Sequence, residues 1–167
     1  TMTFGEQNTQ AEAFQQLEYA LDQGLFFWDT AEMYPVPPKP ETQGATETIL
    51  GNWIAQRGQR DQLFIASKIA GPSQGGSHIR DGQTRFTAAE ISSAIDGSLK
   101  RLQSDYIDLY QLHWPQRPTN FFGKLGYGNT EAHNQQQVTA LEETLSALSD
   151  EIKKGRIRCI GLSNETP

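Results

Sequence analysis

The chain has 167 residues and a formal net charge of −6, a length compatible with one domain that buries a core. The acidic balance repels phosphate backbones and no basic block is interleaved with aromatic residues, so nucleic acid is not an expected partner. No apolar run approaches the roughly 20 residues that span a bilayer, and no signal peptide is recognised at residue 1. Cys159 is the single cysteine, which excludes an internal disulfide and fits a reducing compartment. We therefore expect a cytoplasmic protein with no membrane partner.

Apolar runs of strand length alternate along the chain with segments of helical periodicity. The strand-like runs cover residues 25–29, 63–69, 107–113 and 157–163, with a partial run at residues 1–4. The helical segments repeat apolar residues every three or four positions, and the faces they predict are Ala13, Phe14, Leu17 and Leu21; Ile49, Leu50, Trp53 and Ile54; Ile91, Ile95, Leu99 and Leu102; and Leu141, Leu145, Leu148 and Ile152. The pattern predicts five strands and four helices in strict alternation.

Two of the helical segments carry a start signal in which a threonine precedes a glutamate by three residues. These pairs are Thr87 with Glu90 and Thr139 with Glu142, where each hydroxyl can cap a backbone amide and each carboxylate can reach back. Strands joined by helical crossovers are expected to be parallel and buried on both faces, which suits nearly continuous apolar runs. The predicted fold class is therefore α/β.

The loops that follow the predicted strands are long, whereas the connections that follow the helices are brief. The long loops cover residues 34–44, 69–86 and 114–137. Proteins of the α/β class place their sites at the carboxyl ends of parallel strands. Four chemically different side chains lie at these ends, namely Asp29, Tyr34, Lys68 and His113.

Other polar segments carry weaker signals. Residues 35–40 read PVPPKP and are interpreted as a stiff surface loop rather than a polyproline ligand. Residues 71–82 are rich in glycine but lack the Gly-Lys-Ser/Thr ending of a phosphate loop, which favours a flexible loop. His78 and His133 lie in separate loops without a ligand partner at metal-binding spacing, so no metal site is predicted.

The longest loop contains the aromatic residues Phe121, Phe122 and Tyr127. An ordered loop with its own small apolar cluster and a lid over an apolar substrate are equally compatible with this pattern. Cys159 lies inside a strand-like run, which favours a small core residue over a nucleophile.

Four motifs in order along the chain resemble the aldo-keto reductase superfamily, a TIM-barrel family that uses NAD(P)H. They are WDTAEMY, the lysine ending IASK, LYQLHWP and IGLSN. Within the superfamily, the segments TMTFG, AEMYPVPP, LYQLHWPQRPTNFFGKLGY and IGLSNETP resemble the Tas-like branch. The resemblance implies one barrel domain over residues 1–167 that reduces aldehydes or ketones to alcohols with NADPH.

The catalytic group of that family falls on Asp29, Tyr34, Lys68 and His113. A tyrosine loses its proton at about pH 10, so as an acid near neutrality it needs a neighbouring positive charge, which Lys68 can supply. A buried lysine tends to lose its charge without a carboxylate partner, and Asp29 is the expected partner. We expect His113 to orient the substrate carbonyl while Tyr34 delivers the proton. Trp114 resembles a wall of the substrate pocket, with simple packing as the alternative.

The resemblance also implies positions for the nicotinamide cofactor. The motif GLSN places Ser163 and Asn164 against the nicotinamide carboxamide. Thr1 and Met2 correspond to a contact at the start of the chain, and Asp29 is expected to approach the nicotinamide ribose. The protein is expected to supply geometry and electrostatics while the cofactor supplies the hydride.

The chain is shorter than a complete barrel, which has eight strands and about 250 residues. The remaining strands and the hairpin before the first strand have no counterpart in the sequence, so we expect a partial barrel. Its open sheet edges would favour self-association. Three hypotheses follow: a carbonyl reductase, a regulatory protein that senses bound nicotinamide, and a half-barrel without activity alone.

Overall fold

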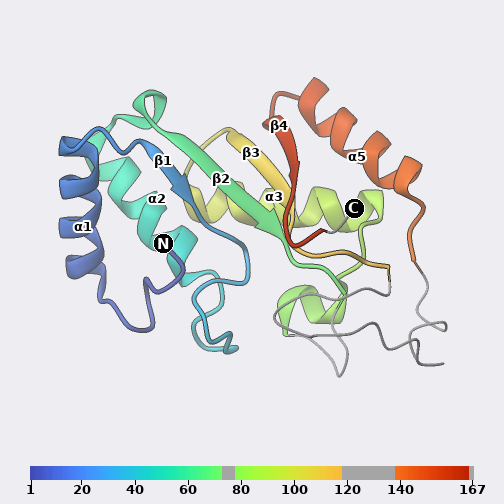
Figure 1. The fold of residues 1–167 in the computed structure, drawn as a ribbon, viewed down its shortest axis with the longest axis horizontal. Helices are drawn as coiled ribbons and strands as arrows, with labels where there is room; N and C mark the ends of the chain where they lie inside the picture. The colour runs from blue at the N-terminus through green and yellow to red at the C-terminus, as the bar shows by residue number, and fades with distance from the viewer. Residues whose placement is uncertain (73–77, 118–137, 166–167) are drawn as a thin grey trace.

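The computed structural model describes residues 1–72, 78–117 and 138–165, and Figure 1 shows their arrangement. One parallel sheet has the strand order β1-β2-β3-β4. Its strands are β1 Phe27–Asp29, β2 Phe64–Ile69, β3 Ile107–Leu112 and β4 Ile157–Leu162. Each strand lies beside the next one along the chain, as successive β-α-β units require. The predicted α/β class is therefore confirmed.

Helices connect the strands, and their bounds are α1 Gln10–Asp22, α2 Ala45–Arg57, α3 Ala88–Leu102 and α5 Leu141–Lys153. Two short 3-10 helices, η1 Arg60–Gln62 and η2 Ile79–Gly82, lie on the loops. In Figure 1, α2 and α3 lie behind the sheet, α1 lies beyond the β1 edge and α5 beyond the β4 edge. Helices α2 and α3 thus cover one face of the sheet.

Residues 1–4 do not form the fifth strand that the sequence predicts. The Phe4 N–H donates to the Thr1 carbonyl and the Asn8 N–H donates to the Thr3 carbonyl, so the segment turns on itself. An isolated bridge joins Phe4 to Asn8. The buried ring of Phe4 accounts for the apolar signal, but local turns use the backbone groups that a strand would direct to a neighbour. The prediction of a strand here is wrong.

The main core fills the space between the sheet and the helices. Trp28 of β1 and Trp53 of α2 pack edge to face with ring centroids 4.9 Å apart. Further large, fully buried side chains are Leu50, Ile65, Ile69, Ile91, Ile95, Leu102, Ile107 and Tyr110. The apolar faces predicted for α1, α2 and α3 all pack against this core, which confirms those three helical patterns.

The face predicted for α5 is wrong except at Leu148. Its three exposed members are Leu141, Leu145 and Ile152. The helix instead buries polar residues that have partners: Thr144 donates to the Phe86 carbonyl at 3.1 Å, and Glu151 forms an ion pair with Arg156. The spacing of apolar residues cannot predict a helix face that is buried through polar side chains, because their partners lie elsewhere in the chain.

One of the two predicted helix start signals is confirmed. Thr87 caps α3, because its hydroxyl accepts from the Glu90 N–H while the Glu90 carboxylate accepts from the Thr87 N–H at 3.2 Å. The pair of Thr139 and Glu142 forms no such box, since α5 has Ala140 as its N-cap residue and Glu142 lies one position too early. The prediction for α5 is therefore wrong.

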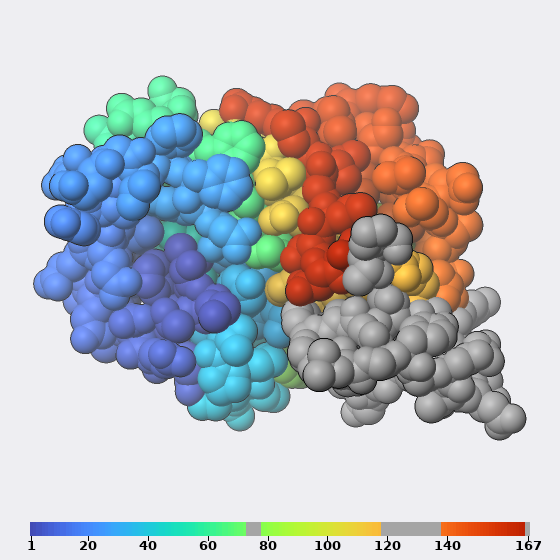
Figure 2. Space-filling view, viewed as in Figure 1, coloured from blue at the N-terminus to red at the C-terminus, as the bar shows by residue number. Residues whose placement is uncertain are grey.

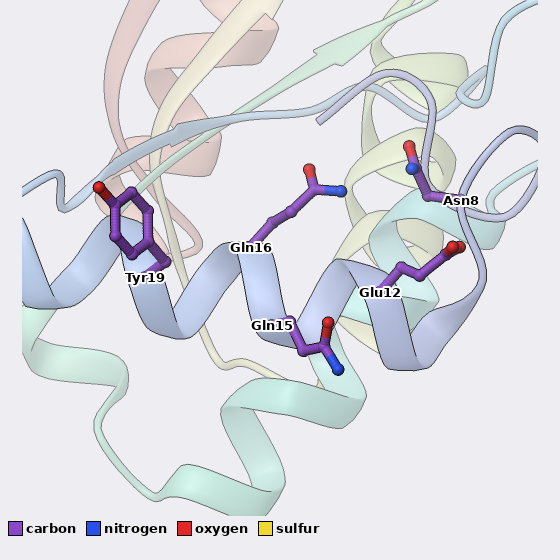
Figure 3. Close-up of a pocket in the computed structure, with 5 residues that line it drawn as sticks. All are labelled: Asn8, Glu12, Gln15, Gln16 and Tyr19. Carbon is purple, nitrogen blue, oxygen red and sulfur yellow. The ribbon is translucent and has the colours of Figure 1, made fainter.

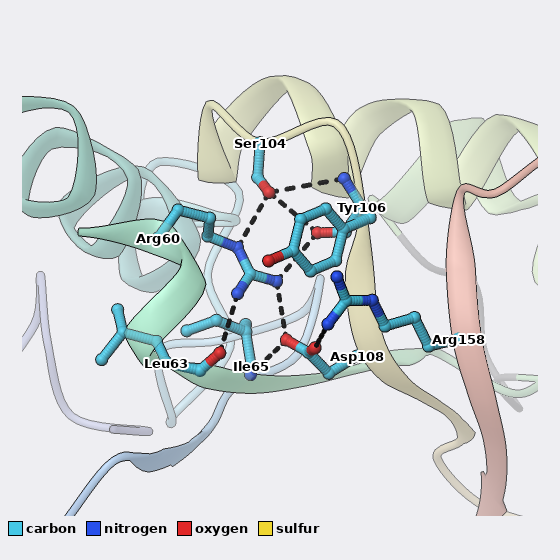
Figure 4. A network of polar contacts seen from close by, with 7 residues as sticks. All are labelled: Arg60, Leu63, Ile65, Ser104, Tyr106, Asp108 and Arg158. Carbon is cyan, nitrogen blue, oxygen red and sulfur yellow. Dashed lines mark hydrogen bonds and ion pairs between the residues drawn. The ribbon is translucent and has the colours of Figure 1, made fainter. Parts of the chain in front are cut away.

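The amino-terminal end of the sheet is held by a polar cluster around Asp108 (Figure 4). Its buried carboxylate accepts from Arg60 at 2.7 Å, from Arg158 at 2.8 Å and from the Ile65 N–H at 2.9 Å. The ring of Tyr106 lies between the two guanidinium groups, whose central carbons are 4.0 and 3.8 Å from its centre. Such a satisfied cluster at this end of the strands indicates a structural role.

The close approach of α2 to α3 yields a test of the packing. A Cβ at Gly51 would lie 2.1 Å from the Arg101 carbonyl oxygen and 2.8 Å from the Leu102 carbonyl carbon. Since backbone cannot move aside cheaply, Gly51→Ala is expected to lower the free energy of unfolding by about 2–3 kcal/mol in urea denaturation. The control is Gly97→Ala on α3, whose Cβ would meet the flexible Arg101 guanidinium at 3.0 Å and which should stabilise by up to about 1 kcal/mol. Equal effects of the two changes would contradict the close approach.

Candidate active site

The structure brings the four predicted catalytic residues together at the carboxyl end of the sheet. Asp29 ends β1, Lys68 lies near the end of β2, and His113 directly follows β3. Tyr34 lies in the loop that follows β1. Three of the four positions are therefore fixed by neighbouring parallel strands, and the fourth comes from a loop at the same end.

Lys68 pairs with Asp29 as expected. Its Nζ donates to Asp29 Oδ2 at 2.6 Å and to the Thr30 carbonyl at 2.8 Å. The lysine side chain is 6% exposed, whereas that of Asp29 is 45% exposed. Burial lowers the pKa of Lys68, and the hydrogen bond and charge of Asp29 together with the charge of Glu47 oppose this shift without cancelling it.

Tyr34 lies between the lysine and the histidine. Lys68 Nζ is 5.0 Å from the centre of the tyrosine ring, and the rings of Tyr34 and His113 meet edge to face at 5.5 Å. Burial, followed by the negative charge of Asp29, raises the pKa of Tyr34 to about 12. The pKa of Tyr34 is therefore raised and not lowered as the sequence predicts, because burial is the dominant cause.

His113 is a buried, neutral imidazole. Burial, followed by the positive charge of Lys68, lowers the pKa of His113 to about 3, so near neutral pH the ring keeps one N–H donor and one acceptor nitrogen. Its backbone is held on both sides: its N–H donates to the Ile69 carbonyl at 3.1 Å, and its carbonyl accepts from Asn164 Nδ2 at 2.8 Å. The imidazole can therefore act as a fixed hydrogen-bond donor.

The predicted cofactor residues at the end of β4 lie beside the histidine. Ser163 donates its N–H to the Leu112 carbonyl at 3.0 Å, which continues the pairing of β4 with β3. Asn164 has a φ of 55°, and its amide also donates to Ser163 Oγ at 3.0 Å. The positive φ turns the chain so that this amide reaches back across the strand end, next to His113.

The predicted cofactor residues at the start of the chain lie beside Asp29. The Thr1 hydroxyl and amino group donate to the Asp29 carbonyl at 2.5 and 3.3 Å. Met2 is exposed, and its carbonyl accepts from the Val36 N–H at 2.9 Å. Figure 2 shows that the amino-terminal segment in dark blue, the loop after β1 and the end of β4 in red reach the same face of the molecule.

Trp114 follows His113 but packs into a small second core. The indole is buried with Ala70 and Ile79, and its Nε1 donates to the Pro72 carbonyl at 3.0 Å. A Cβ at Gly71 would lie 2.6 Å from that nitrogen, so the indole lies directly on the backbone. Packing is thus an observed role of Trp114, and its role as a pocket wall stays a prediction.

The sequence analysis does not identify two polar residues that lie near the four predicted catalytic residues. Gln111 of β3 donates its Nε2 to Asp29 Oδ1 at 3.3 Å. Glu32 is buried, accepts from the Ala70 N–H at 2.5 Å and forms an ion pair with Arg80. Gln111 had a signal in the sequence, because it lies two residues before His113 in the predicted strand run 107–113, and alternate residues of a strand point to the same face.

Other candidate features are less informative. Asn8, Glu12, Gln15, Gln16 and Tyr19 line a shallow polar hollow on α1 that includes none of the predicted site residues (Figure 3). Within the described ranges, no cluster of three or more His, Cys, Asp or Glu residues suits a metal ion, and none of the helices has the length and apolar character of a membrane span. The predictions for the aromatic residues at positions 121, 122 and 127 and for His133 concern positions outside the described residues.

Comparison with known proteins identifies the family. The sequence model of the Aldo/keto reductase family matches residues 1–167, and the chain belongs to this family. It is 56% identical over 167 residues to Protein tas of Escherichia coli (strain K12), covering 99% of the chain and 47% of that protein. It is 32% identical over 165 residues to the uncharacterized oxidoreductase YrpG of Bacillus subtilis (strain 168), covering 98% of the chain and 44% of that protein.

A solved structure supports the same assignment. The aldo-keto reductase from Klebsiella pneumoniae in complex with NADPH matches with a TM-score of 0.66 and 30% identity, covering 99% of the chain and 44% of that protein. The chain thus spans about half the length of the relatives it matches. Its four parallel strands and their helices are part of an α/β barrel of the aldo-keto reductase type.

The neutral state of His113 predicts a dependence of stability on pH. An unfolded histidine takes up a proton at about pH 6.5, whereas folded His113 stays neutral down to about 3. Below about pH 6.5 the unfolded state binds more protons than the folded state. The free energy of unfolding therefore decreases as the pH is lowered. Between about pH 7.5 and about pH 5, urea denaturation should show that His113→Gln loses about 2 kcal/mol less stability than the wild type.

The control for this experiment is His78→Gln, which changes an exposed histidine. It should lose as much stability on acidification as the wild type does. If His113→Gln were equally acid-sensitive, the neutral buried imidazole would be contradicted.

Proposed function

We propose that this chain contributes the catalytic group of an NADPH-dependent reductase that converts aldehydes or ketones to alcohols, as one barrel domain over residues 1–167. The observation that carries the proposal is the contact of the Tyr34 ring with His113 at 5.5 Å and with Lys68 Nζ at 5.0 Å. This contact lies at the carboxyl end of the parallel strands, where barrel enzymes hold their catalytic residues. Membership of the aldo/keto reductase family supports the same reaction class.

Tyr34 is the proposed general acid. With a pKa of about 12 its hydroxyl keeps its proton near neutral pH, so the proton is available as negative charge develops on the carbonyl oxygen. When bound, the nicotinamide supplies the hydride that the carbonyl carbon accepts. Tyr34 gives its proton to the oxygen, which completes the alcohol, and regains a proton from solvent.

His113 and Lys68 prepare the proton transfer. The neutral imidazole of His113 donates its N–H to the carbonyl oxygen and thereby orients the substrate beside Tyr34. Lys68 holds a positive charge near the phenol when paired with Asp29, which favours the phenolate that remains after proton transfer. In this proposal Tyr34 donates the proton, His113 orients the carbonyl group and Lys68 stabilises the phenolate.

The residues proposed for the cofactor fit a nicotinamide carboxamide. Ser163 and Asn164 offer hydroxyl and amide groups at the end of β4, and Asn164 is exposed there. Thr1, Met2 and Asp29 border the same face and are proposed to contact the nicotinamide ribose side of the site. The structural relative in complex with NADPH supports NADPH as the cofactor.

The direct test is Tyr34→Phe in the full-length natural protein. Loss of the acid is expected to lower kcat for NADPH oxidation with aldehydes and ketones by about 10²- to 10⁴-fold, while NADPH binding, measured by fluorescence, stays within about twofold. Tyr19→Phe changes an exposed tyrosine of α1 and serves as the control. Equal turnover of Tyr34→Phe and the wild type would refute the catalytic assignment. Tight NADPH binding without turnover by the wild type would favour the regulatory alternative.

A second proposal concerns association of the chain through its sheet edges. Strands β1 and β4 each pair on one side within the described sheet. Leu25, Phe26 and Phe27 are exposed at the β1 edge, and Leu162 is exposed at the β4 edge. Unpaired edges with apolar side chains favour pairing with another chain. This arrangement supports self-association, as expected of a half-barrel assembly unit.

Light scattering tests this second proposal. The purified chain is expected to show a mass above the 18.6 kDa of one copy, and Phe26→Asp should shift the distribution toward that mass because a charge at the edge opposes pairing. Asp22→Asn, at the end of α1, serves as the control for a change of charge. A dispersed monomer that binds NADPH tightly would contradict the proposal.

A further inference from the structure

Gln111 makes a contact that the proposed mechanism does not use. The residue lies on β3 in register with Lys68 of β2 on one side and with Gly161 of β4 on the other. From this row its Nε2 reaches Asp29 Oδ1 at 3.3 Å. The other oxygen of the same carboxylate, Oδ2, accepts from Lys68 at 2.6 Å. Gln111 and Lys68 therefore each donate a hydrogen bond to a different oxygen of the Asp29 carboxylate.

The carboxylate needs such support because it is not enclosed. The Asp29 side chain is 45% exposed, although the lysine that it accompanies is 6% exposed. An exposed carboxylate on one hydrogen bond can rotate and exchange its partner for water, which weakens an ion pair. A second bond to Oδ1 restricts that rotation and keeps Oδ2 directed at Lys68.

The neighbouring strand leaves room for Gln111. A Cβ at Gly161 would lie 3.1 Å from Gln111 Cγ and 3.1 Å from Leu109 Cδ1. Any side chain at this position of β4 would therefore press on the stem of the glutamine. The absence of a side chain at Gly161 lets Gln111 lie across the sheet toward Asp29.

We propose that Gln111 is a positioning residue, which holds the Asp29 carboxylate in the orientation that pairs with Lys68. This inference rests on the proposed reductase function, since it adds to the same site a residue that acts through Asp29 and Lys68. Gln111 does not exchange a proton in the reaction. Its effect is to keep the ammonium of Lys68 charged beside Tyr34.

The charged groups around Lys68 determine the direction of the expected effect. Asp29 and Glu47 favour its charged form, while burial opposes it. On the other side, the amino group of Thr1 and the ring of His113 experience the positive charge of Lys68, and Tyr34 faces it with its ring. Because Asp29 is the direct hydrogen-bond partner, a loosened Asp29 is expected to lower the pKa of Lys68 further.

The first experiment measures Lys68 without requiring turnover. The purified chain is labelled with ¹³C-lysine and titrated by NMR, and the Lys68 signal is assigned by its loss in Lys68→Met. Gln111→Met keeps a similar length but removes the donor, and it is expected to lower the pKa of Lys68 by about 0.5–1. Asp29→Asn gives the larger shift that shows the method responds. A Gln111→Met titration that coincides with the wild type would overturn the proposal.

A second variant covers the case in which Gln111→Met does not fold. Gly161→Ala leaves the amide intact but crowds its stem, and it is expected to lower the pKa of Lys68 in the same direction. Leu109→Met, one position along the same face of β3, is the packing control and should leave the Lys68 titration unchanged. If Gly161→Ala also left it unchanged, the proposal would fail.

The second experiment separates positioning from general stability. In the full-length natural protein, Gln111→Met is expected to lower kcat by about threefold to tenfold with little change in KM for NADPH. The basic limb of the pH profile of kcat should move to lower pH, because Lys68 loses its proton earlier. An unchanged profile with unchanged kcat would overturn the proposal. If the wild type reduces no carbonyl, the proposed function fails, and the NMR titration alone decides the role of Gln111.

Discussion

The pairing of the buried ammonium of Lys68 with Asp29 is the interaction on which the candidate site depends. Removing a lysine side chain from water costs several kcal/mol unless a carboxylate and further acceptors compensate. Here Asp29 Oδ2 and the Thr30 carbonyl supply that compensation at 2.6 and 2.8 Å. Both partners come from the end of β1, so the charge is stable only while β1 and β2 keep their register. The charge that faces Tyr34 is thus a consequence of the parallel sheet.

Much of the fold was predictable from the sequence, because strands and helices that alternate along a chain are compatible with few topologies. Three helical faces and the four main strands were predicted correctly, and the three helical faces pack against one continuous core. On the edge strands Phe27, Cys159 and Leu162 are exposed, so the prediction of Cys159 as a core residue is wrong. The pattern failed at residues 1–4, where turn hydrogen bonds compete with a strand. It failed again on α5, where the partners of Thr144 and Glu151 lie in other segments. Both errors concern polar groups whose partners a periodicity does not reveal.

The sequence was sufficient to predict which side chains of the candidate site lie together, but not their pKa shifts. Strand-end placement brought Asp29, Lys68 and His113 together, because parallel strands end at one edge. The shifted pKa of Tyr34, about 12, was not predictable, since it depends on how deeply the phenol is buried and on where the carboxylate of Asp29 points. Those quantities arise from packing in three dimensions. The same reasoning explains why Gln111 was overlooked, although its position on β3 marked the correct face.

The ion pairs at the two ends of the sheet differ in the solvent exposure of their carboxylates. At the amino-terminal end, Asp108 is enclosed and fully occupied by Arg60, Arg158 and a backbone N–H, so its charge is held without access to solvent. At the carboxyl end, the carboxylate of Asp29 is half-exposed while its cation is buried. The enclosed cluster around Asp108 joins neighbouring strands. The arrangement around Asp29 keeps a charge available to a neighbouring group, which the proposed proton transfer from Tyr34 would require.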